Sequence, residues 1–208
     1  MADASEWLAL FPLNTILFPD GVLPLRVFET RYVDMVRDCM KSGAPFGVIG
    51  IKSGQEIGAA AEPYTVGTLA SITEWDMPEF GVLLIQTYGG QRFRIEETRI
   101  LPNRGLEARI TLIEADAAVD GGAALPVCAK VLRMVIDDLL ERARAERGTD
   151  FINPFPEPHN LDDAGWVANR WCEMLPIALE EKQQLLEMTD AAARLQRVQG
   201  YLEENGVL

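Results

Sequence analysis

Three cysteines and a single histidine are the residues of this chain that could ligate a metal or form a nucleophilic pair. Cys39, Cys128, Cys172 and His159 match the four ligands of a tetrahedral zinc site, but structural zinc sites bring ligands in as close pairs, and most gaps here span tens of residues. As a base for either later cysteine, His159 would also need an orienting group. Since each cysteine lies in an apolar helical pattern, we expect buried free thiols, an exposed His159, no metal and no cofactor.

Carboxylates are the other abundant reactive groups, among them Glu29, Asp34, Asp76 and Glu79. General acid–base catalysis needs two carboxylates in one partly buried cleft with different pKa values, and a charged surface explains these residues more simply. A phosphate-binding loop needs the spacing G-x-x-x-x-G-K-[ST], which does not occur in this chain. We therefore expect no catalytic residues and no enzymatic activity.

The first half of the chain consists of short β-rich runs separated by Gly and Pro. A helix is expected over Glu29–Ser42, where apolar residues recur every three or four positions and Gly43 can cap the end. Gly89 and Gly90 are predicted to close a hairpin. Residues 52–62 have no periodicity and predict a loop. The expected strands are Leu8–Leu13, Val22–Val27, Phe46–Ile51, Val66–Trp75, Val82–Tyr88, Gln91–Glu97 and Leu106–Asp116.

The apolar period changes from two to about 3.6 residues after the predicted linker AAVDGGAA, residues 117–124. A long helix is expected from there to Gly148, and the prolines of segment 149–160 exclude a regular helix in that segment. The later helices have N-terminal signals at Asp162 or Asp163, at Pro176, and at Thr189 or Asp190. The pattern predicts an α+β fold, with a β-rich domain over residues 1–117 and an α-helical domain of about four helices over 124–208.

Three segments carry a family resemblance: LFPLNTILFPDGVLPLRVFETRY (Leu10–Tyr32), PYTVGTLASITEW (Pro63–Trp75) and LPIALEEKQQLLEMTDAAARLQRV (Leu175–Val198). Together they resemble the N-terminal substrate-binding domain of the ATP-dependent protease Lon, over most of the chain. The resemblance implies a PUA-like β pseudo-barrel followed by a helical bundle. It also implies a stand-alone recognition module, since neither the ATPase nor the peptidase domain of a full Lon protease is present in the sequence.

Two apolar segments are candidate polypeptide-binding sites. Trp75, Met77 and Phe80 surround a predicted hairpin tip at residues 76–81, where polar residues are usual. They either fold back on the neighbouring domain or form a tolerant recognition loop. Phe151 and Phe155 either plug the core between helices or line a groove between the two domains.

Arg26, Glu29 and Arg31 form a charged cluster with two interpretations. We expect ion pairs between elements as the first and the anchoring of a peptide backbone as the second.

The net charge and the length of the apolar runs restrict the possible partners and the location of the protein. The net charge of −13 repels nucleic acid and anionic membranes. The apolar runs are shorter than the roughly 20 residues needed to cross a bilayer, and the first residues do not resemble a signal peptide, so we expect a cytoplasmic protein.

The expected function is non-catalytic binding of unfolded or flexible polypeptide segments, as an adaptor or regulator in proteolysis. The alternatives are a small-molecule-binding protein or enzyme that uses the cleft between the domains, a PUA-like RNA binder, and a structural partner in a larger complex.

Overall fold

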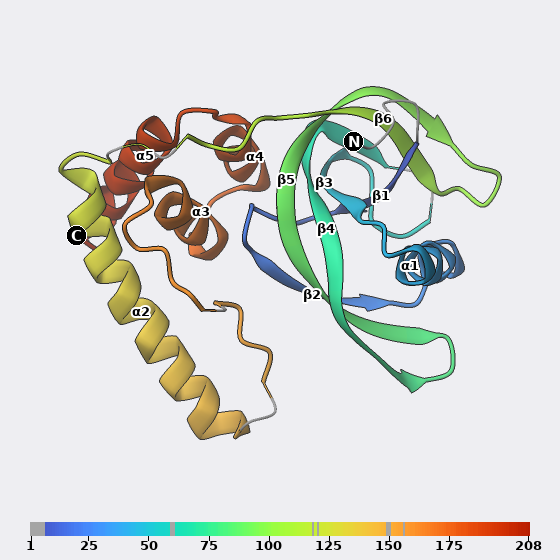
Figure 1. The fold of residues 1–208 in the computed structure, drawn as a ribbon, viewed down its shortest axis with the longest axis horizontal. Coiled ribbons are helices and arrows are strands. Elements are labelled where there is room, and N and C mark those ends of the chain that lie inside the picture. The colour runs from blue at the N-terminus through green and yellow to red at the C-terminus, as the bar shows by residue number, and fades with distance from the viewer. Residues whose placement is uncertain (1–6, 59–60, 118, 120, 149–150, 156) are drawn as a thin grey trace. The chain divides into compact units, whose positions relative to one another are not determined.

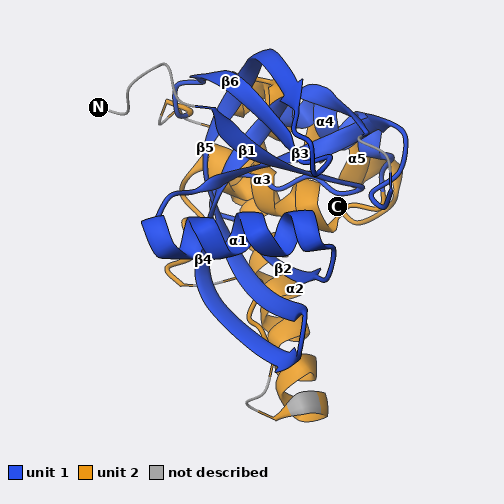
Figure 2. Ribbon diagram, turned by 90° about the vertical axis from the view of Figure 1, so that its right-hand side faces the viewer, with its two compact units in different colours: residues 1–115, 177–186 blue, residues 116–176, 187–208 orange. Residues whose placement is uncertain are grey.

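The computed structural model describes residues 7–58, 61–117, 119, 121–148, 151–155 and 157–208. Contacts within the chain define two compact units (Figure 2). Unit 1 contains residues 1–115 and 177–186, and unit 2 contains residues 116–176 and 187–208. The fold is α+β, as the sequence predicts.

Unit 1 is built on a sheet whose strand order, in the described part of the chain, is β2-β5-β4-β3-β1-β6 (Figure 1). An additional pairing between β5 and β6 closes five of these strands into a pseudo-barrel and leaves β2 outside the closed ring. Among the described strands, β2 therefore pairs with β5 alone and forms an edge. The strands are β1 (Leu8–Leu13), β2 (Val22–Val27), β3 (Phe46–Ser53), β4 (Glu62–Glu79), β5 (Val82–Ile100) and β6 (Leu106–Leu112).

The hairpin predicted at Gly89 and Gly90 is wrong, because β5 runs through both glycines without a turn. A Cβ on Gly89 would lie 2.3 Å from the backbone carbonyl oxygen of Phe18, so any larger residue here would force the backbone to shift. The register of β4 against β5 shifts between Thr68 and Ala70, next to these glycines. Here the glycines mark a close backbone approach and an irregular strand.

Helix α1 (Thr30–Ser42) covers the core of unit 1. Its buried face carries Val33, Val36 and Cys39, which join the cluster around Phe11 and Phe46. The helix ends as predicted at Gly43, whose left-handed backbone (φ 71°) lets its N–H bond to the carbonyl of Cys39. The amphipathic face of one helix thus seals one side of the barrel core.

Helix α4 (Leu179–Glu187) belongs mainly to unit 1. Two buried side chains attach it to the sheet: the Arg92 guanidinium donates to the Leu186 carbonyl at 2.8 Å, and the Gln183 amide donates to the Val66 carbonyl at 3.0 Å. The division expected from the sequence, 1–117 and 124–208, places this helix with the others. That division stays a prediction, whereas the contacts group residues 177–186 with the sheet.

Unit 2 contains the long helix α2 (Ala124–Arg147), then α3 (Ala164–Met174) and α5 (Ala191–Glu204). Two predicted N-caps are confirmed: the Asp163 carboxylate accepts the Trp166 N–H at 2.6 Å, and the Asp190 carboxylate accepts the Ala193 N–H at 3.0 Å. No helix in the described ranges has the length and apolarity that a bilayer span requires.

Candidate functional site

Strands β4 and β5 extend beyond β3 as an arm, residues 74–84. β2 still pairs with the base of this arm, up to Val27 opposite Leu83, so only its end, residues 77–82, is two-stranded. The pairing of β3 with β4 ends at Phe46 and Ala70, whereas β4 continues to Glu79. The turn contains Phe80 and Gly81, and the positive φ of Gly81 (84°) suits a tight hairpin. The observed turn is thus shorter than the predicted tip at 76–81, because the strands pair up to Glu79 and Val82.

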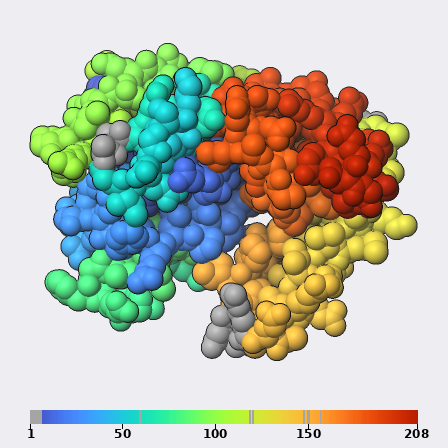
Figure 3. All heavy atoms as spheres, turned by 180° about the vertical axis from the view of Figure 1, so that it is seen from behind, coloured from blue at the N-terminus to red at the C-terminus, as the bar shows by residue number. Residues whose placement is uncertain are grey.

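The arm exposes the three large apolar side chains predicted to surround the hairpin tip. Trp75 is 57% exposed, Met77 39% and Phe80 100%. Figure 3 shows this part of the chain at the molecular surface (teal-green, lower left). Exposed carboxylates at Glu74, Asp76 and Glu79 alternate with them. The arm therefore carries an apolar surface with an acidic border.

The second predicted segment lies in unit 2 and differs from the first. Phe155 is only 4% exposed, and its backbone is held by two contacts. Its N–H donates to the Asn153 side chain at 2.8 Å, and its carbonyl lies 3.0 Å from His159 Nε2. Phe151 is half-buried. A buried Phe155 cannot contact a partner in this conformation, so the structure favours the core plug over the groove for this residue.

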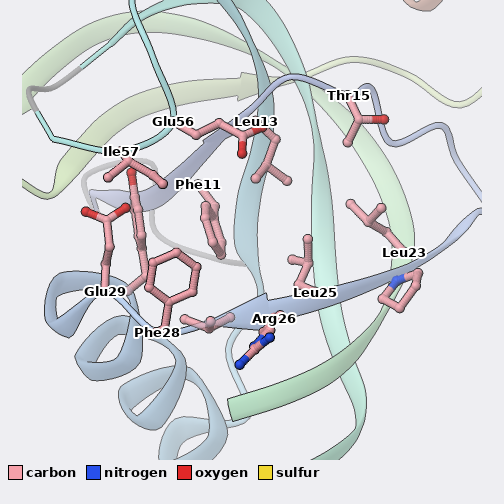
Figure 4. A pocket seen from close by; sticks show the side chains of 13 residues that line it. Phe11, Leu13, Thr15, Leu23, Leu25, Arg26, Phe28, Glu29, Glu56 and Ile57 are labelled. Atoms are coloured by element: carbon pink, nitrogen blue, oxygen red, sulfur yellow. The ribbon is translucent and has the colours of Figure 1, made fainter. Parts of the chain in front are cut away.

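A pocket of about 340 Å³ lies in unit 1 between β1, β2 and the start of α1 (Figure 4). We call it the β2 pocket. Its wall is apolar at the strands, and two carboxylates lie at its rim. Sequence reasoning missed it, since its residues come from four separate elements and loops. They are Phe11, Leu13, Thr15, Leu23, Pro24, Leu25, Arg26, Val27, Phe28, Glu29, Tyr32, Glu56 and Ile57.

Two stacked aromatic rings form part of the wall of the β2 pocket. The rings of Phe11 and Tyr32 stack with centroids 4.2 Å apart and planes 18° from parallel. Burial raises the pKa of the Tyr32 phenol, while the neighbouring Arg31 guanidinium opposes this shift. The phenol therefore stays neutral at physiological pH. Stacked rings and a neutral phenol favour an uncharged occupant.

Arg31 connects the segments that form the rim of the pocket. Its guanidinium pairs with the Glu29 carboxylate at 3.0 Å and donates to the backbone carbonyls of Arg104 at 3.0 Å and Glu56 at 3.3 Å. One ion pair therefore forms within the predicted Arg26, Glu29 and Arg31 cluster, but both partners lie at the start of α1, so ion pairing between elements stays a prediction. The arginine thereby joins the start of α1 to two loops that follow β3 and β5.

The cysteines and the histidine are not brought together as a site. Cys39 is buried in unit 1, while Cys128 and Cys172 are buried in unit 2, and all are free thiols. Burial raises the pKa of the Cys128 thiol to about 11, with a smaller contribution from Glu203. Among the residues with described positions, no group of three or more His, Cys, Asp or Glu could hold a metal ion.

Comparison with known proteins identifies the family. The chain matches the model of the ATP-dependent protease La (LON) substrate-binding domain over residues 7–204. It is 31% identical over 201 residues to Lon protease of Anaeromyxobacter dehalogenans, and the match covers 94% of this chain and 23% of that protein. Lon protease 2 of Myxococcus xanthus is 29% identical, with the same coverage. The chain thus spans about a quarter of the length of these relatives.

Solved structures agree with this assignment. A Lon N-terminal domain protein from Xanthomonas campestris superposes with a TM-score of 0.74 at 31% identity, covering 94% of this chain and 98% of that one. The N-terminal domain of a Mycobacterium avium complex Lon protease gives a TM-score of 0.59 at 18% identity, with 93% and 96% covered, and shows a shared fold. The chain therefore belongs to the family of Lon substrate-binding domains.

Proposed function

We propose that this chain is a non-catalytic recognition module that binds unfolded or flexible polypeptide segments through the arm of β4 and β5. The observation that supports it is the exposure of Trp75, Met77 and Phe80 on one projecting hairpin. Large apolar side chains that are exposed on a projecting hairpin add little to a folded core. Clustered exposed apolar surface is typical of protein interaction sites.

The chemistry of the arm suits tolerant binding. Trp and Phe offer large contact areas, and the flexible thioether of Met adapts to different surfaces. The carboxylates of Glu74 and Asp76 keep the arm hydrated. Their charge also opposes association between two arms. The arm is therefore suited to weak binding of many sequences.

The family supports the remaining parts of the proposal. The matching model describes the substrate-binding domain of Lon, which is distinct from a peptidase domain. We therefore propose no enzymatic activity, a role as adaptor or regulator in proteolysis, and a cytoplasmic location. The net charge of −13 opposes binding to nucleic acid, so the RNA-binding alternative is disfavoured.

The test is capture of a permanently unfolded protein, such as reduced and carboxymethylated lactalbumin, on the immobilised chain. Trp75→Asp and Phe80→Asp should each reduce capture about thirtyfold, since removing a central aromatic contact costs on the order of 2 kcal/mol. Ile100→Asp is the matched control, because Ile100 is 65% exposed, between Trp75 and Phe80, and lies at the far end of β5.

Two outcomes contradict the proposal in different ways. Equal capture by the parent and by both arm variants would remove the arm as the binding site. No capture of any unfolded protein by the parent would remove polypeptide binding as the function.

A further inference from the structure

We propose that the β2 pocket is a second polypeptide-binding site. It would hold one uncharged apolar side chain of an extended segment that adds as a strand to the outer edge of β2. The inference rests on the proposed function and deepens it, since it specifies the conformation and the anchor residue of the bound segment. Strand addition supplies affinity through main-chain hydrogen bonds, and side-chain pockets supply specificity.

The outer edge of β2 is open in the described part of unit 1. β2 pairs with β5 along its whole length, from Val22 opposite Tyr88 to Val27 opposite Leu83, and no strand pairs with its other side. An unpaired strand edge presents N–H and C=O groups to a further strand. β2 therefore offers a template of about six residues.

Pro24 indicates which backbone groups face outward. A proline within a sheet lies on an edge strand with its nitrogen directed away from the partner strand. Alternation along an antiparallel pair then places the nitrogens of Val22 and Arg26 on the same outer side as that of Pro24. The Thr87 hydroxyl donates to the Leu23 carbonyl at 2.9 Å, so the odd-numbered residues face β5. Val22 and Arg26 are thus the outward N–H donors.

The pocket lies on the side of β2 where an added strand would direct every second side chain. Leu23 and Leu25 line the pocket and pack against the core cluster of unit 1. In Figure 4 these two side chains and Phe11 point into the same space. Neighbouring strands direct paired side chains to the same face, so a residue of the added segment opposite Leu23 or Leu25 would enter the pocket.

The size and the wall of the pocket specify the anchor. Its volume of about 340 Å³ is at the lower end of ligand pockets and is more than sufficient for one Leu-, Met- or Phe-sized side chain. Phe28 and Ile57 line it and remain 53% and 61% exposed. Contact with an apolar anchor would remove part of this surface from water, which is the main source of affinity at such a site.

The charges at the rim are already engaged within the protein. The Glu29 carboxylate pairs with Arg31, and the Glu56 carboxylate accepts a hydrogen bond from the backbone N–H of Asn14. Arg26 adds one exposed positive charge to the lining. The rim therefore has no strong excess of either sign, and binding of an uncharged segment should depend little on salt.

The test uses fluorescent peptides of twelve residues in anisotropy titrations of the whole chain. The peptides share a flexible polar sequence and differ at one central position, which is Leu, Phe, Ser or Lys. Leu and Phe should bind about tenfold more tightly than Ser or Lys, because only they bury apolar area in the pocket. The affinities should change less than twofold between low and physiological salt.

Two sets of variants locate the binding. The double variant Phe28→Ser and Ile57→Ser should weaken the Leu peptide about tenfold, since it removes exposed parts of the pocket wall. Arg26→Pro removes an outward N–H at a position that faces the same way as Pro24, whereas Arg26→Ala removes the same charge and keeps the N–H. Weakening by Arg26→Pro alone would support strand addition.

The outcomes separate this inference from the proposed function. Peptide binding that is lost in Phe80→Asp and unchanged in the pocket variants overturns the pocket and leaves polypeptide binding in place. Equal affinity for the Leu and Ser peptides also overturns the pocket. Capture of unfolded protein without binding of any peptide overturns the pocket alone, whereas neither capture nor peptide binding removes both proposals.

Discussion

The side-chain amide of Gln183 in α4 donates a hydrogen bond to the backbone carbonyl of Val66 in β4 at 3.0 Å, across 117 residues of sequence. Both residues are buried. An amide side chain thus satisfies a carbonyl in the interior of unit 1, where water is excluded. Arg92 repeats the arrangement by donating to the Leu186 carbonyl.

Replacing Gln183 should weaken unit 1. Gln183→Leu preserves size and leaves the Val66 carbonyl without this donor, which should lower the free energy of unfolding by about 1–3 kcal/mol. Urea denaturation followed by tryptophan fluorescence measures the loss. Gln184→Leu, at an exposed neighbouring position, should change stability by less than about 0.5 kcal/mol. Equal effects of the two substitutions would show that the buried hydrogen bond contributes nothing.

The two adjacent glycines of β5 should respond differently to alanine. A Cβ at Gly89 would meet the Phe18 carbonyl at 2.3 Å, whereas at Gly90 the nearest atom is the Leu69 carbonyl oxygen at 3.5 Å. Gly89→Ala should therefore destabilise the protein by about 1–3 kcal/mol through overpacking. Gly90→Ala should be neutral or slightly stabilising. Thermal unfolding of both variants checks the contrast, and a tolerated Gly89→Ala would contradict the close approach.

Arg194 should be the most sensitive charged residue of unit 2. Its guanidinium is buried and bonds to the Asp116 carboxylate at 2.8 Å, the Asn169 side chain at 2.8 Å and the Met188 carbonyl at 2.7 Å. Arg194→Met leaves a partly buried carboxylate without its partner and should cost about 3–5 kcal/mol. Chemical denaturation measures this loss. Arg197→Met, on the exposed side of α5, is the control, and a similar loss there would argue against a special role for the buried network.

Cys128 should make stability depend on alkaline pH. Its pKa rises from 9.0 to about 11 in the folded state, because burial disfavours the thiolate. The folded state then holds the proton more tightly than the unfolded state, so stability is complete below pH 9 and falls as the pH rises toward 11. The total loss is on the order of 2–3 kcal/mol. Denaturation curves at pH 8, 9, 10 and 11 give the free energy of unfolding at each pH. This free energy should fall less steeply with pH for Cys128→Ala than for the parent.

The sequence predicted most elements because their signals are local. The bounds of β1 and β2 are confirmed, as are the cap at Gly43 and the N-caps at Asp163 and Asp190. Alternating or helical periodicity and capping residues act within a few positions. Such features can therefore be inferred without knowledge of tertiary contacts.

The wrong interpretation at Gly89 and Gly90 has a tertiary cause. A glycine pair between two β-rich runs usually indicates a turn. Here a distant carbonyl, that of Phe18, requires the missing Cβ, and no local pattern reveals that contact. The strand therefore continues where local propensity favours a reversal.

The candidate sites show the same distinction. The apolar arm could be selected from Trp75, Met77 and Phe80, because large apolar residues at a turn are unusual in any context. Their role in binding stays a prediction. The β2 pocket could not be selected, since Phe11, Leu25 and Ile57 converge only after the strands pair. Phe155 is an apolar residue in a proline-rich loop that is buried, as the core-plug alternative expects, and its part in binding stays a prediction.

The return of residues 177–186 to the sheet has a consequence for biosynthesis. All six described strands are encoded before residue 113, yet the amide of Gln183 and the Leu186 carbonyl leave the ribosome only after the whole of segment 116–176. Domains fold as the growing chain emerges from its N-terminal end. The hydrogen bonds of the Val66 carbonyl and the Arg92 guanidinium to α4 can therefore form only after this helix has been translated. Until then the barrel of the growing chain lacks these two partners.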